Sequence, residues 1–229
     1  MSTSQKPNNH LLAALSAKTY KGLSPQFESV ELKFGETVYG PGDVLSHIYF
    51  VESGIVSMLA VIDAHSTLEV GMVGVEGMVG LPFFLGKKTS GNRAVVQGSG
   101  HALRIKVADF DVECVRSDEL PYIMRAFTYS ILVQIARSAV CNRFHDIESR
   151  LARWLMMTQD RMRSPDFRIT QDFLSYMLGV RREAVNKAAT SLQQRKLISY
   201  VRGNMSITDR TGLEALACNC YGFLASSEM

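Results

Sequence analysis

The stretch RITQDFLSYMLGVRREAVNKAATSLQQRKL, residues 168–197, predicts two short helices joined at Gly179. Thr170 can cap the first helix, and Asp172 falls in its first turn, where the helix dipole favours a carboxylate. Apolar residues then recur at helical spacing until Gly179, which supplies the left-handed backbone that ends many helices. The sequence therefore places a sharp turn between two helices at this point.

The second helix concentrates polar and charged side chains at its start. Val185, Ala188 and Leu192 face inward by their spacing. The side chains that crowd the first turns are Arg181, Arg182, Glu183, Asn186 and Lys187. A helix of this kind, held by a shorter one, can enter the major groove of DNA. The alternative is an ordinary helical hairpin with a solvated charged face, and the pattern favours DNA binding.

The distribution of charge supports a polyanionic partner for the C-terminal half. The chain has 229 residues, which is enough for one large or two small domains, and its net charge is only +3. Residues 143–210 contain 13 Lys and Arg against 7 Asp and Glu, whereas the rest contains 12 against 15. This asymmetry indicates that only the C-terminal part meets a polyanion.

The N-terminal half predicts a small β domain. A short amphipathic helix is expected over residues 11–20. The strands expected after it are 30–34, a pair at 47–54 and 55–63 that turns at Ser53-Gly54, and further strands at 68–72, 92–98 and 102–107. Many short strands at close intervals indicate a barrel, roll or sandwich. The glycines at 71, 74, 77 and 80 could form a phosphate cradle or tight corners, and corners are favoured.

After Asp118 the sequence becomes helical, and a second helix is expected over 146–162. Residues at mostly three- and four-residue spacing form a possible coiled-coil seam in the first of these helices: Leu120, Met124, Phe127, Ile131, Gln134, Ser138 and Cys141. The alternative is a helix packed on the β domain of its own chain. We expect self-association, because the helix is long and the two-helix stretch needs a twofold partner.

The remaining features exclude several classes of protein. The four cysteines, at 114, 141, 218 and 220, make no disulfide framework in a chain this long. Cys218 and Cys220 alone are too few for a closed metal site unless a dimer partner or histidines contribute, so no metal is predicted. Neither a signal peptide nor a run of ~18 apolar residues is present, which predicts a cytoplasmic protein without membrane contact. Paired acid–base carboxylates and nucleophile motifs are also absent, so we do not expect an enzyme.

Beyond Leu197, ISYVRGNMSIT predicts two strands joined by Arg202-Gly203-Asn204, which completes a winged helix-turn-helix. At this point the chain resembles the Crp/Fnr family of bacterial transcription regulators. The resemblance rests on the order of β domain, long helix and winged motif, and on LGVRREAVNKAATSLQQRKLI. It implies an α+β fold with a jelly-roll sensor domain of the cyclic-nucleotide-binding type over 1–117, a dimerisation helix over 118–144 and a DNA-binding domain over 145–229.

The resemblance also implies a homodimer joined through the 119–143 helix. Its two recognition helices, 181–194, would lie about one DNA turn (~34 Å) apart on a near-palindromic site. Arg182 and Glu183 match the family's Arg-Glu pair. Arginine can bond guanine O6 and N7 together, and glutamate can accept from cytosine N4.

Other positions match the family's pattern less closely. Lys187 falls where a second arginine is usual, and Arg181 replaces the usual serine, so that it loses the cap and is expected to bind phosphate. Asn186 is expected to contact adenine or phosphate. Thr170 and Arg202 are expected to position the DNA backbone. RNA polymerase is a further expected partner.

The sensor domain departs from the relatives that bind cyclic AMP. In those relatives a Glu after a Gly holds the ribose, and an Arg-Ser pair holds the cyclic phosphate. Here the corresponding positions carry Leu81, Ser90 and Gly91, and cyclic AMP is not expected to bind, because its phosphate needs a cation. The N-terminal cysteine cluster of iron–sulfur relatives is absent too, so no cofactor is predicted. The alternative function is a cyclic-nucleotide or other small-ligand sensor whose output is a protein–protein contact.

Overall fold

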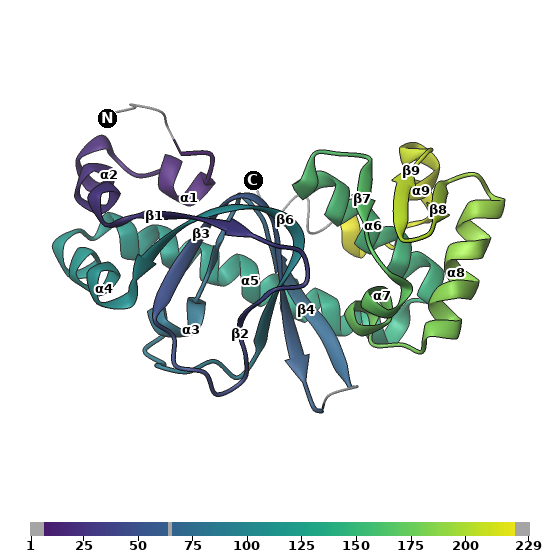
Figure 1. Cartoon of the computed structure of the whole chain (residues 1–229), viewed down its shortest axis with the longest axis horizontal. Coiled ribbons are helices and arrows are strands. Elements are labelled where there is room, and N and C mark those ends of the chain that lie inside the picture. Colours follow the sequence, from purple (N-terminus) through teal and green to yellow (C-terminus); the bar gives the residue numbers. More distant parts are fainter. Residues whose placement is uncertain (1–6, 64–65, 223–229) are drawn as a thin grey trace. The chain divides into compact units, whose positions relative to one another are not determined.

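The computed structural model describes residues 7–63 and 66–222, and the chain has the predicted α+β fold (Figure 1). Two compact units are formed, one by Met1–Met58 with Met72–Ile131 and the other by Leu59–Gly71 with Leu132–Met229. None of the helices in the described part of the chain has the length and apolar character that a membrane span requires.

Six strands build the N-terminal sheet, in the order β1-β6-β3-β4, with β2 beside β6 and β5 beside β3. The strands are β1 (Glu28–Leu32), β2 (Thr37–Tyr39), β3 (His47–Val61), β4 (Thr67–Val73), β5 (Met78–Val79) and β6 (Arg93–Lys106). The accompanying helices are α1 (His10–Ala13), α2 (Ala17–Leu23), the 3₁₀ turn η1 (Ser24–Gln26), α3 (Leu81–Phe84) and α4 (Val107–Arg116). Ile48, Phe50 and Ile55 of β3 are fully buried in the core.

The prediction of two strands that turn at Ser53-Gly54 is wrong. Strand β3 is 15 residues long and continues through both residues. Gly54 has a φ of +85°, and a Cβ there would lie 2.5 Å from the carbonyl oxygen of Gly98 in β6. The glycine therefore bends the strand where a second strand approaches closely, as glycines in strand interiors often do. The two strands predicted over 92–98 and 102–107 are likewise one strand, β6.

The helices of this half also differ from the prediction. The helix expected over 11–20 is two helices, because the side chain of Ser16 accepts a hydrogen bond from the backbone of Thr19 and starts α2 anew. Helix α4 follows β6 directly, and neither α4 nor α3 was predicted.

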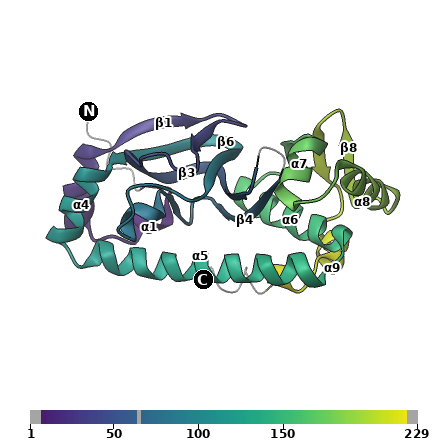
Figure 2. The same cartoon turned by 90° about the horizontal axis from the view of Figure 1, so that it is seen from below.

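The long helix α5 spans Glu119–Phe144, close to its predicted bounds, and Figure 2 shows it as one unbroken helix. The residues predicted as its coiled-coil seam are all buried within the chain itself, and the most exposed of them, Phe127, is 6% exposed. Phe127, for example, lies directly against Gly77. That stripe therefore cannot be a dimer seam, and for it the alternative of packing within the chain is correct.

The C-terminal elements include the two helices and the hairpin of the predicted winged helix-turn-helix, together with β7 and α9, which were not predicted. They are α6 (Ile147–Met162), β7 (Asp166–Arg168), α7 (Gln171–Leu178), α8 (Arg182–Gln194), β8 (Ile198–Val201), β9 (Asn204–Ile207) and α9 (Arg210–Leu216). Helix α6 packs against α8 and α9, and its Trp154 is buried. The wing has three antiparallel strands in the order β7-β9-β8, and β7 falls in a segment expected only to interrupt two helices.

We expect Gly54→Ala to lower the free energy of unfolding by more than Gly35→Ala does. Gly35 has a similar φ of +81°, but a Cβ there meets no described atom within 4 Å, so Gly35→Ala measures backbone strain alone. That strain is roughly 1–2 kcal/mol. Gly54→Ala adds a collision with backbone, and overpacking costs about 1–3 kcal/mol more. Urea denaturation of both variants tests this, and equal losses would show that β3 and β6 do not approach closely at Gly54.

Candidate nucleic-acid interface

Helix α7 is fixed at both ends by the residues that the sequence identifies. The Oγ1 of Thr170 accepts a hydrogen bond from the backbone N–H of Phe173 at 3.1 Å and caps the helix. Gly179 ends it with a left-handed backbone, at φ 62° and ψ 39°. Leu174 and Met177 are buried. The apolar side of α7 is therefore turned inward, and Asp172 in its first turn stays exposed.

Helix α8 separates an apolar side from a charged one. Val185, Ala188, Ala189 and Leu192 are buried. The side chains predicted to contact DNA from this helix are all exposed: Arg181, Arg182, Glu183, Asn186 and Lys187. Arg181 stands at the N-cap position, where its side chain caps none of the described backbone amides, as expected from its replacement of serine. The exposed side is continuous over the first two turns.

Arg182 is held by two residues at the start of α7. Its guanidinium lies 3.4 Å from a carboxylate oxygen of Asp172, and its Nε donates to the side-chain oxygen of Gln171 at 3.4 Å. The amide of Gln171 in turn donates to the Oδ1 of Asn186 at 3.0 Å. The side chains of Arg182 and Asp172 are 61% and 60% exposed. Exposed ion pairs are worth about 1 kcal/mol or less, so a DNA base can replace this one.

The wing presents Arg202 at the tip of a tight hairpin. Arg202 and Gly203 have φ values of 51° and 81°, and Val201 pairs with Asn204, so the turn has two residues and Asn204 belongs to β9. A turn with two positive φ values fits the right-handed twist of a hairpin. The hydroxyl of Tyr200 donates to the carbonyl of Ile169 at 2.9 Å and fastens the wing to the segment before α7. Burial raises the pKa of Tyr200, which keeps the hydroxyl protonated as a donor.

A cleft of about 380 Å³ brings together three of the predicted contact residues. It is lined by Thr170, Gln171, Asp172, Arg182, Tyr200, Arg202 and Gly203. The other four predicted residues, Arg181, Glu183, Asn186 and Lys187, lie outside this lining on the exposed side of α8. Sequence reasoning missed Gln171 and Tyr200, and it assigned Asp172 only to the helix dipole. Gln171 and Asp172 precede Arg182 by about three helical turns, and only the bend at Gly179 brings them together.

The sensor domain supplies no charged group at the positions that hold a cyclic nucleotide in relatives. Leu81 begins α3 and is 8% exposed. Ser90 is buried and donates a hydrogen bond to the carbonyl of Asn92 at 2.9 Å. Burial raises the pKa of Tyr39 to about 12, although hydrogen bonds to the Gly80 backbone and the Ser90 side chain oppose the shift. Tyr39 is therefore neutral and forms hydrogen bonds with two residues of this region. That cyclic AMP does not bind remains a prediction.

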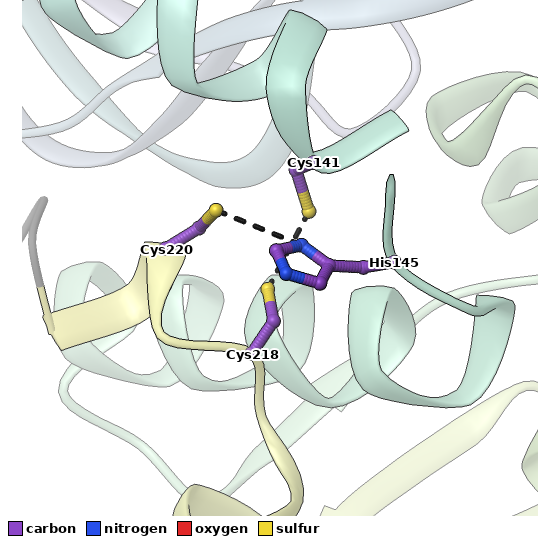
Figure 3. A group of neighbouring side chains, drawn as sticks. All are labelled: Cys141, His145, Cys218 and Cys220. Carbon is purple, nitrogen blue, oxygen red and sulfur yellow. Dashed lines mark hydrogen bonds between the residues drawn. The ribbon is translucent and has the colours of Figure 1, made fainter. Parts of the chain in front are cut away.

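Two residues beside Cys218 and Cys220 were missed. Cys141 and His145 lie with this pair, and the ligand atoms of all four are within 4.8 Å of one another (Figure 3). The spacing of Cys141 and His145, four residues apart, was a local sequence signal for a shared site. Their proximity to Cys218 and Cys220 could not be predicted from the sequence, because the segment after α9 returns to the end of α5 only in the folded chain.

Two family models match this chain in the order of its elements. Residues 29–118 match the cyclic nucleotide-binding domain, and residues 149–216 match the Crp-like helix-turn-helix domain. Together these matches cover more than half of the chain. No curated protein sequence gives a significant match.

Solved structures of regulators share this fold over nearly their whole length. The c-di-GMP responsive global regulator CLP of Xanthomonas campestris has a TM-score of 0.70 and 19% identity, with 84% of this chain and 99% of that chain covered. FixK2 from Bradyrhizobium japonicum has a TM-score of 0.70 and 14% identity, with 84% and 98% covered. A Crp/Fnr-family transcriptional regulator from Thermus thermophilus has a TM-score of 0.67 and 20% identity, with 83% and 98% covered. With both domain models in the family's order on this fold, the chain belongs to the Crp/Fnr family of transcription regulators.

Proposed function

We propose that this regulator binds a near-palindromic DNA site as a homodimer, with α8 of each protomer in the major groove. The observation that carries the proposal is the exposure of Arg182 and Glu183 on one side of α8. The opposite side of the helix buries Val185 and Leu192. A helix N-terminus with such side chains matches the way helix-turn-helix proteins contact base edges. The excess of basic residues over 143–210 supports a polyanionic partner.

The side chains divide into those that read bases and those that contact phosphates. We assign Arg182 to a guanine and Glu183 to a cytosine, because their donors and acceptors fit those base edges in the major groove. Lys187 and Asn186 are placed one turn further along the same side and would extend the contact. Arg181, Arg202 and Thr170 are assigned to the DNA backbone, which fixes the register and carries no sequence information.

The homodimer is supported by an exposed apolar stripe on α5 that differs from the seam predicted from sequence. Large apolar side chains on this stripe are Tyr122 at 70% exposed, Tyr129 at 70%, Leu132 at 60%, Val140 at 43% and Phe144 at 72%. Successive members are three, four or seven to eight residues apart, so they lie along one side of the helix. At 26 residues, α5 is roughly 39 Å long, which gives two such helices room to pair. An apolar stripe of this extent on a soluble protein marks an interaction site.

RNA polymerase as a partner and the cytoplasm as the compartment stay expectations from the family resemblance and the sequence. No effector is proposed for the sensor domain, because the positions that hold a cyclic nucleotide in relatives carry Leu81, Ser90 and Gly91.

Replacing Arg182 with Ala should weaken binding at one base-pair position in each half-site. Loss of a bidentate guanine contact is expected to cost roughly 1–3 kcal/mol and to relax the preference at that position only. Arg195→Ala is the matched control, because Arg195 follows the far end of α8 and pairs with Glu148 at 2.9 Å. Affinities for single-base variants of the site test the assignment. An equal loss on every sequence would make Arg182 a phosphate contact instead.

Replacing Arg202 with Gly should weaken DNA binding without destabilising the protein. Glycine accepts the positive φ of 51° at this position more easily than arginine does, so thermal stability should stay the same or rise. The affinity should fall by a similar factor for all sequences, and the salt dependence should lose about one unit of slope. Titrations at several salt concentrations test this. Unchanged affinity and slope would remove Arg202 from the interface.

Replacing Leu132 with Glu should dissociate the homodimer, since it places a charge in the middle of the exposed stripe of α5. Val115→Glu is the matched control, because Val115 is 85% exposed but belongs to α4, a helix that contributes no residue to the stripe. Analytical ultracentrifugation should find wild type and Val115→Glu as dimers and Leu132→Glu as a monomer. A monomeric wild type, or a dimer that Leu132→Glu leaves intact, would contradict the proposed seam.

A further inference from the structure

Four metal-ligating side chains meet beside the end of α5, away from the proposed DNA contacts. Cys141 is in the last turn of α5, His145 follows that helix directly, and Cys218 and Cys220 follow α9 (Figure 3). All four belong to the same compact unit. The three cysteines are buried and His145 is half-buried. Three thiols and one imidazole form one of the common ligand sets of structural zinc sites.

The distances within the cluster fit a single tetrahedral ion. The Sγ atoms of Cys141 and Cys218 are 3.5 Å apart, and the Sγ of Cys220 is 3.7 Å from the Nδ1 of His145. Zinc bonds of about 2.3 Å to sulfur and about 2.0–2.1 Å to nitrogen place neighbouring ligand atoms roughly 3.6–3.8 Å apart. No two of the four ligand atoms are more than 4.8 Å apart, so the widest separation needs to close by at most about 1 Å. An iron–sulfur cluster distributes its ligands over several iron atoms, which a group this compact does not favour.

A buried arginine beside the cluster is the second observation. Arg153 of α6 is 7% exposed, and its Nε and Nη1 have no hydrogen-bond partner among the described residues. Its charge acts on Cys141, Cys218 and Cys220. A buried cation needs a negative partner, and neutral thiols do not supply one.

The charge of a loaded site would meet this need. A divalent zinc ion with three thiolates and one neutral imidazole carries a net charge of −1, and the guanidinium of Arg153 would offset it. Groups that surround metal ligands commonly stabilise them in this way. A disulfide between Cys141 and Cys218 would leave His145, Cys220 and Arg153 without a role.

We propose that Cys141, His145, Cys218 and Cys220 bind one zinc ion in a closed tetrahedral site. With all four positions filled by the protein, the ion would be structural, because a catalytic zinc keeps one position open. It would tie the segment after α9 to the junction between α5 and α6. The site thus fixes the C-terminal segment to the helix that carries the proposed dimer stripe.

Metal analysis of the full chain tests the proposal. The chain is purified without an affinity tag or chelator, and its metals are measured by mass spectrometry. We expect about one zinc per chain, as a closed structural site requires. Cys218→Ser and His145→Ala should lose the zinc. Cys114→Ser should keep it, because Cys114 lies on α4 outside the cluster. Loss from Cys114→Ser equal to that from Cys218→Ser would overturn the site.

A measurement on the wild-type chain keeps the test valid if a variant does not fold. Zinc is removed with a chelator under reducing conditions and replaced by cobalt. We expect the strong visible absorption of tetrahedral thiolate-bound cobalt, and a melting temperature that falls on removal and returns when zinc is added. Wild-type protein without zinc, iron in place of zinc, a Cys141–Cys218 disulfide in freshly purified protein, or cobalt without that absorption would each contradict the proposal.

Discussion

The left-handed backbone at Gly179 is the constraint on which the proposed DNA interface depends. It ends α7 and turns the chain so that α8 can bury Val185 and Leu192 while its first turns stay exposed. The same turn brings Asp172 beside Arg182, ten residues later in the sequence. A residue with a Cβ would be strained at this φ of 62°. The positions of the predicted base contacts therefore follow from one backbone conformation and from the apolar residues on either side of it.

Helices of the C-terminal half could be predicted from sequence because their signals are local. Thr170 and Asp146 cap their helices as side-chain acceptors, and apolar periodicity defines the buried sides. The β domain was harder. A glycine with positive φ can end a strand or bend it. At Gly54 the strand bends and continues, because Gly98 of β6 lies close to it. That approach joins residues 44 positions apart, which no local pattern contains.

The long helix shows a second limit of periodicity. Helix α5 has apolar residues on two sides, and spacing identifies the stripes without saying what covers each. The stripe through Gln134 and Ser138 is buried within the chain, whereas the stripe through Tyr129 and Leu132 is exposed. The cysteine cluster could not be predicted for the same reason, since Cys141 and Cys218 are separated by 77 residues and meet only in the folded chain. In both cases the local sequence identifies the type of side chain, but only the folded chain determines which residues it contacts.

Helix α5 connects the two proposals made for this regulator. Its exposed stripe would align two protomers, and its last turn contributes a ligand to the proposed zinc site. In the proposed complex, two copies of α8 read a symmetric DNA sequence. The decisive test of this symmetric binding is the selection of random duplexes by the purified protein, with sequencing of the bound fraction. We expect an enriched near-palindrome whose half-sites lie about one helical turn apart. Enrichment of an unsymmetric single site, or binding without any sequence preference, would contradict it.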